Sequence, residues 1–271
     1  MAILRPARDR DHGLYLRLFA ELGVDDPPAD AERWAVELAP DAHVLEHDGE
    51  AVGYVLVQIL DGVGYVRHVV VDPAARGRGF GHEAMRGVAS LFRDAGCTSW
   101  CLNVKPDNEP AVRLYRRCGM VERYRTVSVR WRWSLLDDLA SPASSELADL
   151  APVSCGHAEP DALEEIEACF SLPSGLLATF AAKERVALIA ARRGGRIVGV
   201  ASFDPVFPGC FPFRADDLAA AVALLEAARA HAPSDAEHLQ LVVEDAPQLV
   251  VALEDLGAIR MLEFAHYGGA L

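Results

Sequence analysis

Two pairs of short segments match each other across the two halves of the chain, in the same order. Residues 49–55 (GEAVGYV) align with 195–201 (GRIVGVA), and 114–119 (LYRRCG) align with 252–257 (ALEDLG). Around these matches, the periodicity of apolar residues and the positions of glycine predict the same order of strands and helices in both halves. Because 271 residues suffice for two ordinary domains, we predict a tandem duplication of one fold.

The boundaries of the two copies follow from the local composition. In the first copy the predicted order is β-α-α-β-β-β-α-β-α-β-β, in which residues 121–134 form two strands or one long hairpin. A stretch rich in serine, proline and acidic residues at 135–150 is typical of a linker. We therefore predict a first domain over 1–134 and a second domain over 151–271.

The composition is that of a globular protein, with 51% hydrophobic and 24% charged residues. There is no run of about 18 apolar residues, and the N-terminus lacks the apolar core of a signal peptide. We therefore expect a cytoplasmic protein that does not enter a membrane. The six cysteines form neither a C-x-x-C pair nor a zinc-like spacing with histidine, so we expect reduced thiols and no metal.

The net charge of −14 is distributed unevenly along the chain. Residues 1–133 carry a net charge of −1, whereas residues 134–271 carry −13. Such an acidic half repels phosphates, which argues against nucleic acid as a partner. The acidity is compatible with a cationic substrate such as an amine, and equally with a role in solubility alone.

A basic, glycine-rich loop, Arg76-Gly77-Arg78-Gly79-Phe80-Gly81, follows a predicted strand at 63–71 and precedes a predicted amphipathic helix at 82–95. Glycine allows the backbone to approach a ligand closely. The free N–H groups at a helix start favour a pyrophosphate, and two arginines add charge-assisted donors. The loop is therefore a candidate diphosphate site, the alternative being a flexible basic turn.

Two common nucleotide motifs do not fit this loop. A dinucleotide fingerprint requires G-x-G-x-x-G and an acidic residue about 20 positions further on, but the spacing here is G-x-G-x-G and the next strand ends at Asn103-Val104-Lys105. A Walker A loop requires Gly-Lys-Ser/Thr, which is absent from the loop.

The loop and its surroundings resemble the GNAT superfamily of acyl-CoA N-acyltransferases over residues 1–133. Arg76, Gly79 and Gly81 fit that family's (Arg/Gln)-x-x-Gly-x-(Gly/Ala) signature, and residues 102–104 with 108–115 resemble its second signature. The resemblance implies an α/β (α+β) fold with a mixed, mostly antiparallel sheet flanked by helices, here in two tandem copies.

The resemblance also implies a cofactor site. Acetyl-CoA is the expected acyl donor, with its pantetheine arm in a V-shaped gap between the strands at 63–71 and 98–104 and its pyrophosphate on the N–H groups of residues 77–82. The residues expected to contact it are Val69, Val71, Arg76, Gly77, Arg78, Gly79, Phe80, Gly81, His82, Asn108 and Tyr115.

Direct attack on the thioester by a primary amine, from a small molecule or a peptide, is the reaction that the resemblance implies. Tyr115 matches the tyrosine that often protonates the departing thiolate, and a phenol is protonated at neutral pH. His68 is a candidate general base because of its intrinsic pKa; Glu46, Glu83 and water are the alternatives. A non-catalytic CoA-binding sensor or assembly module is the competing function, and the chain is expected to be a monomer or a homodimer.

The second half lacks the features of the loop. Residues 207–217 (FPGCFPFRADD) take its place, where prolines remove N–H donors and two aspartates would repel a pyrophosphate; Leu253 stands opposite Tyr115 in the alignment. We therefore predict a degenerate second copy that does not bind acyl-CoA, and one active site per chain.

Overall fold

The computed structural model describes residues 2–23, 27–60, 62–139, 152–206 and 209–271. Contacts divide the chain into two compact units. Unit 1 comprises Met1–Tyr124 with Phe264–Leu271, and unit 2 comprises Arg125–Glu263. No helix within these described ranges is long and apolar enough to cross a membrane.

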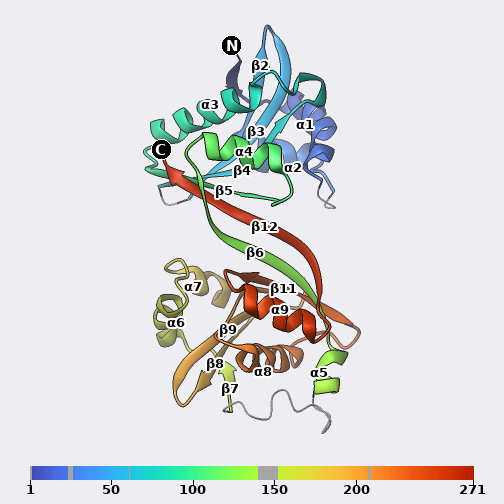
Figure 1. The fold of residues 1–271 in the computed structure, drawn as a ribbon, viewed down its shortest axis with the longest axis vertical. Coiled ribbons are helices and arrows are strands. Elements are labelled where there is room, and N and C mark those ends of the chain that lie inside the picture. Colours follow the sequence, from blue (N-terminus) through green and yellow to red (C-terminus); the bar gives the residue numbers. More distant parts are fainter. Residues whose placement is uncertain (1, 24–26, 61, 140–151, 207–208) are drawn as a thin grey trace. The chain divides into compact units, whose positions relative to one another are not determined.

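Unit 1 is a six-stranded sheet in the order β1-β2-β3-β4-β5-β12 (Figure 1). Its strands are β1 (Ile3–Pro6), β2 (Ala42–His47), β3 (Glu50–Leu60), β4 (Val63–Val71), β5 (Ser99–Val104) and the end of β12 (Ile259–Ala270). All neighbours are antiparallel except β4 and β5, which are parallel. Antiparallel neighbours can follow one another through tight turns, which explains the predicted hairpins at residues 42–71.

Helices cover both faces of this sheet. They are α1 (His12–Phe19), α2 (Ala31–Arg33), α3 (Phe80–Asp94) and α4 (Glu109–Arg117). The apolar stripe of α3, which includes Met85, Val88 and Phe92, is buried against Val66 and Leu102 of the sheet. Gly64 of β4 has no side chain because the Phe92 ring lies 2.3 Å from the position that a Cβ would take. On the other face, α1 packs on β3 and β4 through a second apolar cluster.

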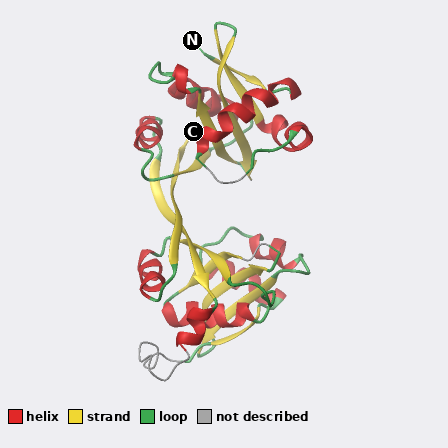
Figure 2. Cartoon of the chain, turned by 90° about the vertical axis from the view of Figure 1, so that its right-hand side faces the viewer, coloured by secondary structure: helices red, strands yellow, loops and turns green. Residues whose placement is uncertain are grey.

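Unit 2 repeats the arrangement, with the strand order β7-β8-β9-β10-β11-β6. The strands are β7 (Ser154–His157), β8 (Ala187–Arg193), β9 (Arg196–Asp204), β10 (Gly209–Ala215), β11 (His238–Glu244) and the end of β6 (Val121–Arg132). The helices are α5 (Ser134–Leu139), α6 (Leu163–Cys169), α7 (Leu176–Ala181), α8 (Leu218–Arg229) and α9 (Pro247–Asp255). Helices again lie on both faces (Figure 2), and β10 and β11 are the parallel pair. The predicted tandem fold is confirmed.

The last strand of each sheet comes from the other copy, and for this reason the division differs from the predicted boundaries at 134 and 151. β12 pairs with β5 in unit 1, with Ala265 opposite Val104, whereas β6 pairs with β11 in unit 2, with Arg132 opposite His238. The expected pair of strands or hairpin over 121–134 is wrong, since Val121–Arg132 is one long strand.

The predicted linker at 135–150 also differs in part from the structure. Its first residues lie in α5, where Leu135 and Leu136 are buried in the unit 2 core. The remainder, from residue 140 on, lies outside the described residues.

Candidate acyl-CoA site

The parallel strands β4 and β5 separate halfway along their length. They pair only over Val63–Val66 and Ser99–Leu102. Beyond that point, β4 continues to Val71 beside β3, while β5 continues to Val104 beside β12. A gap between these strands therefore exists where the V-shaped opening was expected.

A β-bulge in β4 determines which residues face the gap. Leu56 of β3 lies opposite His68, but Val57 lies opposite Val66, so Arg67 is an extra residue. Such an insertion reverses the alternation of side chains along the strand. As a result, Val69 packs toward the α3 side of the sheet and His68 faces the α1 side.

The backbone of β4 presents donors to the gap. The N–H of Asp72 donates to the carbonyl of Val52 in β3. Because antiparallel strands alternate between hydrogen-bonded and open positions, the N–H groups of Val69 and Val71 point away from β3. These groups can therefore pair with the amides of an extended ligand.

The glycine-rich loop leads into the start of α3 with free donors. Gly77 and Gly79 have φ values of 77° and 86°, a left-handed conformation that favours glycine. The carbonyl of Gly79 accepts the first helical bonds, from His82 N–H at 3.0 Å and Glu83 N–H at 3.2 Å. The N–H groups before them are those that a helix start leaves without internal acceptors, so the loop suits an anion.

A cavity of about 650 Å³ joins the gap to the loop. Ten of the predicted contact residues line it: Val69, Val71, Arg76, Gly77, Gly79, Phe80, Gly81, His82, Asn108 and Tyr115. Two predicted residues do not line it. Arg78 has its guanidinium 4.9 Å above the Phe80 ring, and His68 lies on the α1 side of β4.

Arg76 is held at the cavity by two contacts. Its Nε donates to the carbonyl of Val71 at 3.1 Å, and its Nη2 donates to Glu21 Oε2 at 2.6 Å. Glu21, in the turn Ala20–Leu22 after α1, also lines the cavity. The sequence analysis missed Glu21, because no local pattern links it to a loop 55 residues away.

Helix α4 supplies Asn108 and Tyr115. Asn108 precedes the helix, and its Oδ1 accepts the Ala111 N–H at 3.2 Å, which leaves its Nδ2 as the donor for a ligand. Tyr115 is 8% exposed. Burial raises the pKa of its phenol to about 12, so it stays protonated at neutral pH.

The three candidate bases all lie outside the cavity lining. His68 Nδ1 is 3.3 Å from the Tyr54 hydroxyl, and burial lowers the His68 pKa to about 4. Glu46 accepts a bond from Arg5 at 2.7 Å. Glu83 accepts the N–H of Ala2. The structure therefore does not bring these three groups to the cavity.

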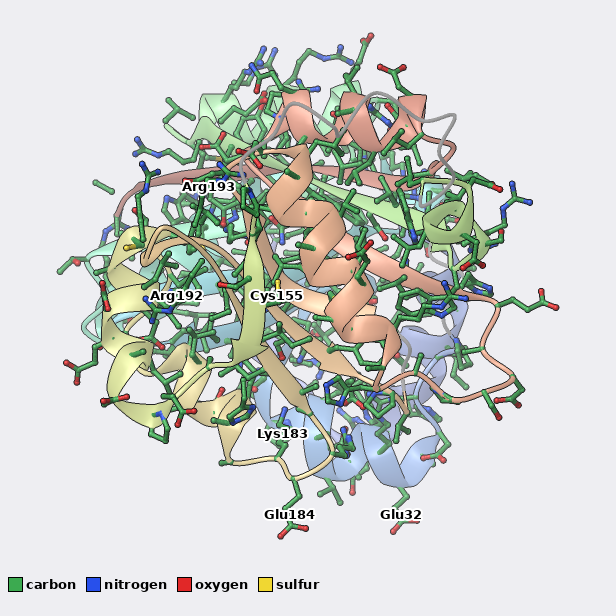
Figure 3. All side chains as sticks on the ribbon, turned by 90° about the horizontal axis from the view of Figure 1, so that it is seen from below. Glu32, Cys155, Lys183, Glu184, Arg192 and Arg193 are labelled. Atoms are coloured by element: carbon green, nitrogen blue, oxygen red, sulfur yellow. The ribbon has the colours of Figure 1, made fainter. Side chains whose placement is uncertain are left out.

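The equivalent region of unit 2 is built differently. Gly209–Ala215, expected as a loop, is strand β10, because it pairs with both β9 and β11. Only Asp216 and Asp217 then connect β10 to α8. Arg193, at the end of β8 (Figure 3), binds Asp217 through two bonds of 2.7 and 3.0 Å. Asp216 and Asp217 thus form the strand-to-helix connection that in the first copy is the glycine-rich loop.

Comparison with known proteins places the first half in one family. Residues 12–120 match the model of the Acetyltransferase (GNAT) family. A probable glucosamine 6-phosphate N-acetyltransferase 2 of Oryza sativa subsp. japonica is 41% identical over 61 residues, which cover 22% of this chain and 35% of that relative. The chain thus spans about a third of the length of this relative.

Two further proteins extend the comparison. An aminoglycoside N(6')-acetyltransferase type 1 of Stenotrophomonas maltophilia is 30% identical over 134 residues, covering 38% of this chain and 88% of that protein. The crystal structure of a GCN5-related N-acetyltransferase from Sphaerobacter thermophilus shares the fold over 99% of this chain and 95% of that one, with a TM-score of 0.65 at 17% identity. The chain belongs to the acetyltransferase (GNAT) family.

Proposed function

We propose that unit 1 is an acetyl-CoA-dependent N-acetyltransferase that acts on a primary amine of a small molecule or a peptide. The observation that carries this proposal is the cavity that joins open backbone donors on β4 to the free N–H groups at the start of α3. A ligand that fits both ends has an amide-containing arm followed by a diphosphate, which is the chemistry of coenzyme A.

The cavity residues divide the binding between them. The amides of the pantetheine arm pair with the backbone of Val69 and Val71. The pyrophosphate accepts from the loop N–H groups of residues 77–82, where the helix dipole and Arg76 add positive charge. Arg78, exposed beside the loop, contributes to the surrounding field, and Asn108 Nδ2 donates to the arm.

The reaction consists of attack by the amine nitrogen on the thioester carbonyl carbon, followed by loss of the thiolate. Tyr115 donates its proton to the departing sulfur, and its raised pKa keeps that proton available at neutral pH. His68 is a candidate for the base, although its low pKa makes it a weak proton acceptor; water is the alternative. Unit 2 does not bind acyl-CoA, since Asp216 and Asp217 oppose a pyrophosphate.

Two measurements on the full chain test the proposal. Calorimetric titration with acetyl-CoA should show one saturable site, and thiol release should follow addition of an amine. The amine panel should include an amino sugar phosphate and an aminoglycoside, in line with the acceptors in the relatives' names, together with a peptide. Saturable binding without turnover on any amine would favour the sensor function, and no binding at all would refute both.

A further inference from the structure

Two arginines of α4, Arg113 and Arg117, line the same cavity and have no role in the function proposed above. They are four positions apart, so their side chains leave the helix on the same side, one turn from each other. Both residues are exposed. With Arg76 they give the cavity lining three arginines against a single carboxylate, that of Glu21. The cavity therefore suits a ligand with more than one phosphate group.

Contacts between α4 and α3 fix the place of this pair. Leu114 Cδ2 lies 3.1 Å from the position that a Cβ of Gly81 would take. One turn further along α4, Cys118 Sγ lies 3.9 Å from His82 Nδ1. Arg113 and Arg117 directly precede Leu114 and Cys118 in the sequence. The pair therefore borders the glycine-rich loop where that loop enters α3.

The pair lies on a different side of α4 from the residue that faces the interior of the cavity. Tyr115 is 8% exposed. At 100° of rotation per residue, Arg113 and Arg117 each lie about 160° around the helix from Tyr115. The two arginines thus form the outer rim of the cavity. An arm bound in the gap and a diphosphate bound on the loop leave the adenosine end of CoA to extend toward this rim.

The adenosine end of CoA carries a phosphate that the loop does not bind. This phosphate is a monoester at the 3′ position of the ribose, and such a group has a charge of about −1.5 to −2 at pH 7. A guanidinium matches phosphate oxygens with two parallel N–H donors. Because Arg113 and Arg117 are one turn apart on α4, a single phosphate can accept from both.

The existing contact of Arg113 leaves it available for a ligand. Its Nη1 donates to Glu109 Oε2 at 2.9 Å, and the two side chains are 58% and 76% exposed. Solvent screens such a pair, so exchanging the carboxylate for a phosphate costs little. Arg116, which lies between the two arginines in the sequence, is exposed as well but lies outside the cavity lining.

We propose that Arg113 and Arg117 bind the 3′-phosphate of CoA and make the site selective for CoA over dephospho-CoA. The inference rests on the proposed function. Dephospho-CoA has the same arm, diphosphate and adenosine and lacks only the 3′-phosphate. A difference in Kd between these two ligands therefore measures the contribution of the arginine pair.

Calorimetric titration of the full chain with CoA and with dephospho-CoA tests the subsite. At low salt, the Kd for dephospho-CoA should be about fivefold or more above that for CoA. The ratio of the two values should shrink at higher salt, because screening weakens contacts between exposed charges. Equal Kd values for the two ligands at low salt would overturn the proposal. This comparison needs no variant, so it decides the question even if a variant fails to fold.

Variants assign the difference to the two side chains. Arg113→Gln and Arg117→Gln should each raise the Kd for CoA and leave the Kd for dephospho-CoA within twofold of the unmodified chain. In the double variant, the ratio of the two Kd values should fall to about 1–2. Arg116→Gln is the matched control and should keep the ratio of the unmodified chain. If the two variants raise both Kd values equally, the arginines attract anions only in a general way and the subsite is refuted.

The outcomes separate this inference from the proposed function. If neither CoA nor dephospho-CoA binds, the proposed function fails and the subsite fails with it. If both bind with equal Kd, only the subsite fails. Binding of a phosphate of the acceptor by these arginines would also leave the ratio at one and would count against the proposal.

Discussion

Replacing Glu21 with glutamine should strengthen CoA binding, because Glu21 lines the cavity in which we propose that the diphosphate binds. Its carboxylate accepts a hydrogen bond from Arg76 Nη2 at 2.6 Å. A bound diphosphate must draw Arg76 away from Glu21 and must also tolerate that carboxylate nearby. Glu21→Gln removes the charge but keeps the size of the side chain.

The exposure of the pair determines the magnitude. The Arg76 side chain is 52% exposed and that of Glu21 is 34% exposed, so solvent screens the pair and its loss is worth about 0.2–1 kcal/mol. A carboxylate about 7 Å from one phosphate charge adds about 0.6 kcal/mol of repulsion in water. Together these terms, about 0.8–1.6 kcal/mol, predict a Kd for CoA that is about 4–15-fold lower in the variant.

Calorimetric titration of CoA into both proteins at two salt concentrations is the assay. The difference should shrink at higher salt because screening weakens both contributions. Glu37→Gln is the matched control, since Glu37 forms a 2.9 Å pair with Arg33 outside the cavity; its Kd should be unchanged. An unchanged or higher Kd for Glu21→Gln, with a normal control, would refute the reasoning.

Three further predictions concern single groups. Tyr115→Phe should lower kcat about 10²-fold without changing the Kd for acetyl-CoA, measured by thiol release and calorimetry. Asp217→Ala should destabilise unit 2 by about 1–2 kcal/mol, because Asp217 caps α8 through Ala220 N–H at 2.9 Å and pairs with Arg193. Thermal unfolding measures this loss of stability, and CoA binding should be unchanged. The free energy of unfolding should fall as the pH drops from about 6.5 to 4. Folding lowers the His68 pKa to about 4, so over this range His68 binds a proton in the unfolded chain but not in the folded one. In urea unfolding, His68→Gln should lose less stability over this pH range than the unmodified chain.

Each of these predictions has an outcome that contradicts it. An unchanged kcat in Tyr115→Phe would exclude the acid role of the phenol. Glu37→Gln, a surface change in unit 1, serves as the reference for Asp217→Ala. Equal unfolding temperatures for the two variants would show that the Asp217 cap of α8 contributes nothing to stability. If His68→Gln and the unmodified chain lose equal stability between pH 6.5 and 4, other groups account for the acid sensitivity.

Residues that act within one stretch of chain were predictable from the sequence. The loop at 76–81 and helix α4 with Asn108 and Tyr115 lie together in the structure, since each side chain is positioned by its own strand–loop–helix segment. The contacts of Glu21 with Arg76 and of His266 with Asn103 were not predictable, because they join residues 55 and 163 positions apart. The strand Gly209–Ala215 was missed since its proline and glycine are typical of a turn, and only its pairing with β9 and β11 makes it a strand.

By itself, the sequence determined that the chain holds two copies of one fold and that only the first has a glycine-rich loop. The two copies follow from the local periodicity of apolar residues, and the loop follows from its glycines, which have special backbone freedom. The tertiary structure decided which sheet each final strand joins. Alternation of side chains specifies which face of a strand is buried. The backbone hydrogen-bonding groups are the same in nearly every residue, so they do not specify which strand pairs with which. For that reason Phe264–Leu271 could complete the first sheet and bring His266 to Asn103, a contact that no local pattern predicts.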